Sequence, residues 1–264
     1  MHKEDKAILS TFVEVFKSFR LDQIEQPQLT YDPTAQLIIA NLNEVFFNSV
    51  CIKRPLSHDK LIGELQDLQR SLNQPLTVWI TPETEDNEFE AELKKHFESP
   101  GAFYGMILDI NNANFAKTNK NIKIKLVKND TDATVFSKIY CEIFHFPNLV
   151  QHVEQWANLQ RKMDNPTCLN YIATIDGSNV GVSTLVIDKN FTEFKTGGFY
   201  NACVLPQYRN LGVATAMACH RIETSKTLGL EYLSIILMSN AMARGYCKKL
   251  GFNDCKTLTP YFIK

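Results

Sequence analysis

The chain has 264 residues, of which 44% are hydrophobic and 22% are charged, and its net charge is -1. This composition excludes a wholly disordered chain, a collagen-like chain and a low-complexity scaffold, because such chains lack the apolar residues that build a core. The nearly balanced charge argues against a nucleic-acid-binding protein with a strongly basic surface. The length fits one large domain or two small ones.

The cysteines and the N-terminus indicate a cellular location. Seven cysteines are present, and none form the CxxC pattern of a zinc site or a redox motif. Residues 1–6 are charged, and no apolar stretch of a secretion signal follows them. No run of apolar residues approaches the ~18 that a transmembrane helix needs. We therefore expect a cytoplasmic protein with free thiols, without a metal, and without membrane or nucleic-acid partners.

The first part of the chain alternates expected helices and strands. Apolar residues at helical spacing predict a helix near 8–19. The elements expected after it are strands at 37–39 and 45–47, a helix at 59–72, a strand at 76–80, a helix at 83–97 and a strand at 103–110. The letters Ser57-His58-Asp59 indicate a helix cap, because adjacent residues cannot form a catalytic triad.

A polar stretch of asparagine and lysine at 111–121 is the predicted linker. It divides the chain into an N-terminal α/β domain, 1–118, and a second domain, 122–264. The second domain is expected to contain a strand at 122–127, helices at 132–144 and 149–163, a hairpin of 171–175 and 180–187, a strand at 199–204, a helix at 212–227, a strand at 230–238, a helix at 241–250 and a strand near 257–263.

The segment 203–215 carries the clearest chemical signal, because a strand ends there and a helix begins. A helix N-terminus offers unpaired backbone N–H groups and a partial positive charge. Gly212 and Ala214 leave room for a ligand to approach these groups, and Arg209 adds a charged donor. The pattern favours a phosphate or pyrophosphate site, although Gly212 by itself also fits a simple turn. It matches neither a Walker loop nor a dinucleotide fingerprint.

Two motifs in this half resemble one family. The pattern Val204-x-Pro206-x-x-Arg209-x-x-Gly212-x-Ala214 resembles motif A of the GNAT superfamily of N-acetyltransferases. The segment Asn240-Ala241-Met242-Ala243-Arg244, continued by Tyr246-Cys247-Lys248-Lys249-Leu250-Gly251-Phe252, resembles the terminal segment of the same family. The resemblance covers about 122–264. Residues 1–118 look, more loosely, like the degenerate front half of two-domain members.

This resemblance implies an α/β (α+β) GNAT fold with a mixed sheet that is splayed at the end of the strand 199–204. It also implies acetyl-CoA as co-substrate. The pantetheine arm is expected beside Ala202, Cys203 and Val204. The pyrophosphate is expected on Arg209, Asn210, Leu211, Gly212, Val213, Ala214 and Thr215. Ser239 and Asn240 are expected to line the opposite wall, and the acceptor is expected to enter near 145–150.

The reaction that the resemblance implies is direct transfer of an acetyl group to a primary amine of a small molecule or a peptide. Cys247 lies at the position where the family usually has its tyrosine, and Tyr246 lies one residue earlier, so each is a candidate proton donor. The alternative is that both simply pack. The segment 196–202 carries no carboxylate, although many relatives have a glutamate there. Asn201 or Tyr200 is then expected to hold a relay water, with Glu193, His145 and His152 as more distant candidate bases.

Two other function classes stay open at this point. The missing strand carboxylate and the displaced tyrosine also fit a non-catalytic module that binds or senses acyl-CoA. An interaction protein that has kept the fold without a ligand is the other alternative. The acceptor, the length of the acyl chain and the oligomeric state, a homodimer included, are not determined by the sequence.

Overall fold

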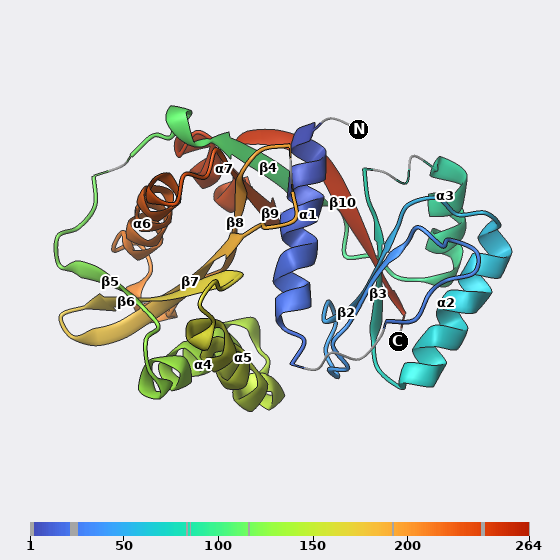
Figure 1. The fold of residues 1–264 in the computed structure, drawn as a ribbon, viewed down its shortest axis with the longest axis horizontal. Coiled ribbons are helices and arrows are strands. Elements are labelled where there is room, and N and C mark those ends of the chain that lie inside the picture. Colours follow the sequence, from blue (N-terminus) through green and yellow to red (C-terminus); the bar gives the residue numbers. More distant parts are fainter. Residues whose placement is uncertain are drawn as a thin grey trace.

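The computed structural model describes residues 3–21, 26–82, 84, 86–115, 117–191, 193–238 and 241–263. Its strands form one ten-stranded sheet in the order β1-β2-β3-β10-β4-β9-β8-β7-β6-β5 (Figure 1). Parallel pairing joins β2 to β3 and β8 to β9, and the other neighbours are antiparallel. The predicted α/β fold with a mixed sheet is confirmed.

The first part of the chain follows most of the predicted pattern. Its elements are α1 (Lys3–Ser18), β1 (Gln36–Ile39), β2 (Asn48–Ile52), α2 (His58–Leu72), β3 (Leu76–Ile80), α3 (Asn87–His96) and β4 (Phe103–Asp109). Ser57 is the N-cap residue of α2, which confirms the reading of Ser57-His58-Asp59 as a cap. The helix α3 begins at Asn87 rather than at 83, because the Asp86 side chain accepts a hydrogen bond from the Phe89 amide and caps it there.

The strand predicted at 45–47 was wrong. The chain turns there, with Phe46 in the left-handed region at φ 76, and the strand begins at Asn48. The two aromatic rings of this run instead pack against rings that are distant in the sequence. Phe46 lies 5.8 Å from Trp79, and Phe47 lies 5.7 Å from Phe146, measured between ring centroids. The apolar character of the run therefore comes from tertiary packing.

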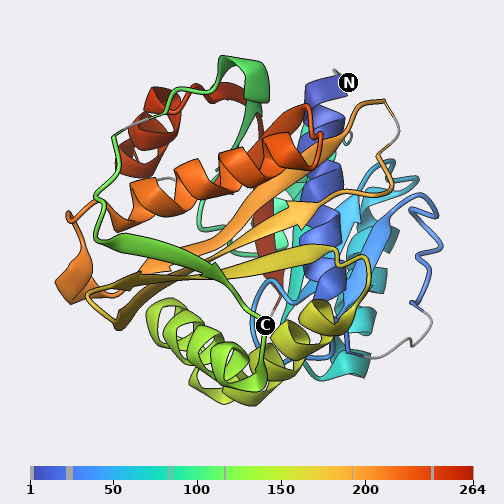
Figure 2. The same cartoon turned by 60° about the vertical axis from the view of Figure 1, so that its left-hand side comes forward.

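The second part also keeps the predicted order. Its elements are β5 (Ile122–Leu126), α4 (Asp130–Phe144), α5 (Val150–Lys162), β6 (Cys168–Ile175), β7 (Ser178–Ile187), β8 (Thr196–Val204), α6 (Val213–Thr227), β9 (Tyr232–Leu237), α7 (Ala241–Lys249) and β10 (Asn253–Ile263). The helix α6 packs on one face of β5–β8, while α4 and α5 pack on the other (Figure 2). The helix α7 lies on the α6 side, because Cys247 and Leu250 share a buried cluster with Ala218 and Ile222.

The helix α1 lies across the middle of the sheet, on the face that carries α4 and α5 (Figure 1). The Phe19 ring stacks on Trp156 of α5 at 4.2 Å between centroids, and the Trp156 Nε1–H donates to Ser18 Oγ at 3.1 Å. Phe12 contacts Trp79 of β3 edge-on at 4.7 Å. One helix therefore packs against both parts of the chain.

The two parts complete each other's sheet. The strand β4 pairs with β9 from Tyr104–Leu237 to Asp109–Tyr232. The strand β10 pairs with β3 along its second half and with β4 along its first half, with an irregularity between Asp254 and Thr257. The last strand of each part, β4 in the first and β10 in the second, thus lies beside strands of the other part. The division at 118–122 stays a prediction, and the sheet itself runs across it without a break.

Candidate functional site

The strands β8 and β9 separate half-way along β8. They pair in parallel only from Thr196–Tyr232 to Phe199–Ile235. On its other edge, β8 has a bulge: Tyr200 pairs with Thr184 and Cys203 pairs with Val182, so Asn201 and Ala202 face one residue of β7. Asn201 adopts a left-handed backbone at φ 54, which asparagine tolerates better than most residues. The bulge bends β8 away from β9 and opens the sheet.

A cavity of about 490 Å³ occupies this opening, between the two strands and the helices α6 and α7. Most of the predicted cofactor-binding residues line it, namely Ala202, Val204, Arg209, Asn210, Gly212, Val213, Ala214 and Thr215. Two do not: the Cys203 side chain is buried against the α4 layer, and Leu211 is exposed. The predictions for Ser239 and Asn240 fall outside the described residues.

The N-terminus of α6 opens toward this cavity. Gly212 is its N-cap residue at φ 87, and a Cβ at this position meets no atom within 4 Å. No side chain caps the helix, and the first turn contains no acidic residue. The amide groups and the positive end of the helix dipole are therefore available to an anion. Arg209 precedes them, and its Nε–H donates to the Val204 carbonyl at 3.3 Å, which fixes the base of its side chain.

The two candidate proton donors both line the cavity from α7. Burial raises the pKa of Tyr246 to about 12, and the nearby Thr215 hydroxyl acts in the opposite direction. The Tyr246 hydroxyl makes no hydrogen bond of standard geometry with any residue the structure describes. Burial also raises the pKa of the Cys247 thiol to about 11, and the cation of Arg221 partly offsets this. Both groups are protonated at neutral pH.

The sequence analysis did not identify one residue that lines this cavity. Arg221 lies in the third turn of α6, is only 3% exposed and lines the cavity. The sequence alone does not mark it, because the buried residues of α6, among them Ala218 and Ser225, form no clear apolar stripe. A buried cation is uncommon enough to indicate a site.

The opposite face of β8 carries a chain of polar side chains. Asn201 Nδ2 donates to Thr184 Oγ1 at 3.2 Å, and this hydroxyl donates to Asn170 Oδ1 at 2.7 Å. The Tyr200 hydroxyl lies 3.2 Å from Thr11 Oγ1 of α1, and burial raises its pKa. Asn201 therefore lies on the face of α4 and α5, away from the cavity.

The more distant candidate bases have other contacts. Glu193 forms an ion pair with Lys6 at 3.1 Å. His152 Nε2 lies 2.7 Å from the Phe19 carbonyl, so this ring helps to hold α1. His145 ends α4 in a left-handed conformation at φ 59. The geometry gives none of the three a place in the cavity.

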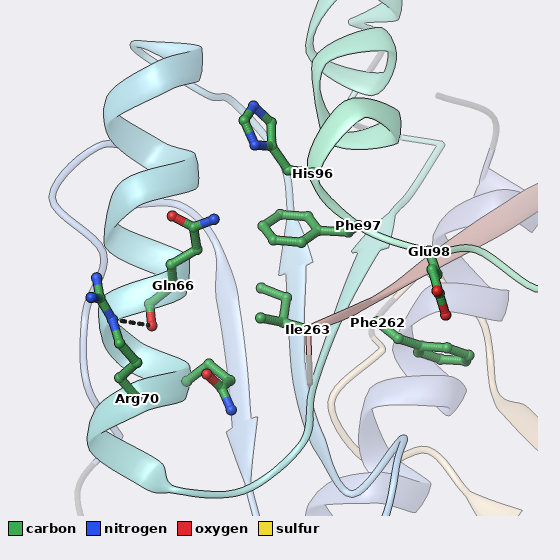
Figure 3. Close-up of a pocket in the computed structure, with 8 residues that line it drawn as sticks. Gln66, Arg70, His96, Phe97, Glu98, Phe262 and Ile263 are labelled. Atoms are coloured by element: carbon green, nitrogen blue, oxygen red, sulfur yellow. Dashed lines mark hydrogen bonds between the residues drawn. The ribbon is translucent and has the colours of Figure 1, made fainter.

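A second hollow lies in the first part of the chain, between α2, α3 and the end of β10 (Figure 3). It has a larger volume, about 580 Å³, and polar residues at its rim. Two of its polar side chains already have neighbours on their own helices, since Arg70 pairs with Asp67 and His96 lies 3.3 Å from Glu92. It lacks the strand opening and the helix N-terminus of the first cavity, and we assign it no function.

In the part of the chain that the structure describes, no three His, Cys, Asp or Glu side chains gather as metal ligands would. Among the described helices, none is long and apolar enough to span a bilayer. None of the seven cysteines, all of which lie within the described residues, forms a disulfide, and all except Cys255 are buried.

Comparison with known proteins identifies the second part. Residues 135–252 match the model of the acetyltransferase (GNAT) family. An N-alpha-acetyltransferase of Sulfurisphaera tokodaii is 31% identical over 101 residues, which are 35% of this chain and 60% of that protein. Residues 135–252 are a GNAT acetyltransferase domain. The match spans less than two thirds of the curated relative, so that protein's activity as a whole is not carried over.

Solved structures extend the likeness of fold beyond the GNAT domain. A GCN5-related N-acetyltransferase from Kribbella flavida superimposes with a TM-score of 0.68 at 9% identity, over 98% of this chain and 93% of its own. A tandem GNAT protein from the clavulanic acid pathway gives a TM-score of 0.59 at 12% identity, over 81% and 74% of the two chains. At these identities the comparison concerns the fold alone.

The first part repeats the order of the GNAT domain without its opening. The run β2-α2-β3-α3 has the same sequence of elements as β8-α6-β9-α7, and both strand pairs are parallel. However, β2 and β3 stay paired from Ser49–Thr77 to Ile52–Ile80. The N-cap of α2 is Ser57 in an extended conformation, where the GNAT domain has left-handed Gly212. A phosphate site comparable to that of α6 is therefore not built there.

Proposed function

We propose that this protein is an acetyl-CoA-dependent N-acetyltransferase that moves the acetyl group to a primary amine of a small molecule or a peptide. The cavity in the β8–β9 opening, closed at one end by the uncapped N-terminus of α6, is the observation that carries this proposal. It lies within the segment that matches the GNAT family.

The residues present fit coenzyme A. The backbone amides of Leu211–Thr215 and the Arg209 side chain would hold the pyrophosphate, because a helix N-terminus and a guanidinium both favour a dianion. Open space over Gly212 gives the phosphates access to these amides. The bent half of β8, at Ala202 and Val204, would pair with the amides of the pantetheine arm. Tyr246 supplies a buried hydroxyl on the opposite wall.

The chemistry needs a neutral amine on the other face of β8. The acceptor nitrogen attacks the thioester carbonyl, the C–S bond breaks with its electron pair on sulfur, and the amine releases one proton to water. Asn201 has no group that titrates in this range, so its role would be to orient such a water. Cys247 and Tyr246 are the candidate donors of a proton to sulfur on the cavity side.

The absence of a carboxylate on β8 favours an acceptor that is already partly neutral. An α-amino group has a pKa near 8, so about one tenth of it is neutral at pH 7, against fewer than about one in a thousand lysine side chains. The similarity to an N-alpha-acetyltransferase supports the same choice. We therefore infer that α-amines are better acceptors than ε-amines.

An assay of thiol release tests this function. Two peptides of one sequence are compared at pH 7, one with a free N-terminus and no lysine, the other with a blocked N-terminus and one lysine. We expect the free α-amine to be acetylated at least tenfold faster. Small primary amines are tested as acceptors in the same assay. Binding of acetyl-CoA without thiol release on any amine would contradict the proposal and favour a non-catalytic acyl-CoA module.

A further inference from the structure

Arg221 is a buried cation that pairs with no acidic residue in the described part of the chain. Its Nε–H donates to the Met217 carbonyl at 3.3 Å, and Nη1 donates to the Thr184 carbonyl at 3.0 Å. Its guanidinium carbon lies 3.8 Å from the centroid of the Phe199 ring. Among the residues that the structure describes, no carboxylate pairs with it and nothing accepts a hydrogen bond from Nη2.

The surroundings of Arg221 do not neutralise it. The titratable groups that interact with it are Tyr171 of β6, His220 of α6, and Tyr246 and Cys247 of α7. Burial raises the pKa of the two tyrosines and the thiol and lowers the pKa of His220, so all four are uncharged at neutral pH. Loss of water lowers the pKa of Arg221 to about 10, which still leaves a full positive charge. Burying a lone charge is costly, and a negative group on a ligand would offset that cost.

The position of Arg221 along α6 matches one part of coenzyme A. It lies eight residues after Val213, which is about 12 Å along a helix axis. The pantetheine arm has about the length of four extended residues, about 13 Å. With the pyrophosphate on the first turn of α6, the sulfur end of the arm is expected at the depth of Arg221. Neither Cys247 nor Tyr246 offers a charge there.

We propose that Arg221 is a catalytic residue that binds the thiolate of coenzyme A and stabilises it as the acyl group leaves; this inference rests on the proposed function. The C–S bond breaks and its electron pair stays on sulfur beside the guanidinium. The sulfur takes up a proton from water only after release. A thiolate is a much weaker base than an alkoxide, so a fixed cation beside it removes the need for a proton donor at this position.

Proton release on binding tests this inference without any acceptor. Free CoA and desulfo-CoA, in which hydrogen replaces the thiol, are titrated calorimetrically at pH 7 in two buffers of different ionisation enthalpy. A cation within contact distance is expected to lower the pKa of the bound thiol by about two units. CoA should then release a measurably larger fraction of a proton than desulfo-CoA, whose phosphates are the same.

Variants separate this role from a structural one. In Arg221→Met the excess proton release should vanish, while the affinity for desulfo-CoA stays within about threefold. Arg221→Lys should keep part of the release, and Cys247→Ala should keep all of it. Equal proton release for the two ligands in the natural protein would overturn the inference, even if Arg221→Met does not fold. Failure of desulfo-CoA to bind the natural protein would instead overturn the proposed function.

Discussion

Gly212→Leu is expected to weaken acetyl-CoA binding by at least a hundredfold while the protein stays folded. A Cβ at this position meets no protein atom within 4 Å and Gly212 lines the cavity, so a leucine side chain is expected to cover the amides that we assign to the pyrophosphate. The left-handed backbone at φ 87 adds a cost of about 1–2 kcal/mol to folding for any residue other than glycine. Isothermal titration and thermal melting measure the two effects separately.

Gly177→Leu is the matched control for this variant. Gly177 has a similar backbone at φ 83, also with nothing within 4 Å of its Cβ, and it lies in the β6–β7 turn away from the cavity. We expect a similar loss of stability and an unchanged affinity for acetyl-CoA. An affinity of Gly212→Leu within threefold of the natural protein would remove α6 from the cofactor site.

The second large effect concerns the strand pairing between the two parts of the chain. A fragment of residues 119–264 contains the whole segment that matches the GNAT family, yet we expect it not to fold by itself. In this fragment β10 loses both of its neighbours, β3 and β4, and β9 loses β4 and becomes an open edge. The fragment also lacks α1, whose Thr11 contacts Tyr200 of β8.

Circular dichroism and thermal melting of the fragment check this expectation. We expect no cooperative transition for 119–264 alone. Co-expression with 1–118 is the control, and it should restore one transition together with acetyl-CoA binding. A fragment that melts cooperatively and binds acetyl-CoA like the full chain would show that the GNAT domain is independent of the first part.

Local sequence patterns predicted individual elements well. The strand β3 was predicted with its observed limits, because Leu76–Ile80 is a short run of apolar and β-branched residues. The first turn of α6 was found through Gly212, whose left-handed conformation is a requirement of the turn itself. These features depend on a few neighbouring residues, so the sequence contains them directly.

The features that were missed depend on contacts between distant residues. Nothing within 253–263 indicates that β10 pairs with β3 rather than with a strand of its own half. The apolar run around Phe46 resembles a strand in sequence, because ring packing between distant residues and burial of a strand give the same local pattern. Arg221 was overlooked because its burial becomes apparent only when α6 lies on β7 and β8.

The central claim is that the cavity between β8 and β9 binds the co-substrate of acetyl transfer. Calorimetric titration of the full chain with acetyl-CoA tests it most directly. We expect saturable binding of one equivalent with a dissociation constant on the order of micromolar. No binding at millimolar acetyl-CoA would contradict the account. The opening would then belong to a protein that has kept the fold for another purpose.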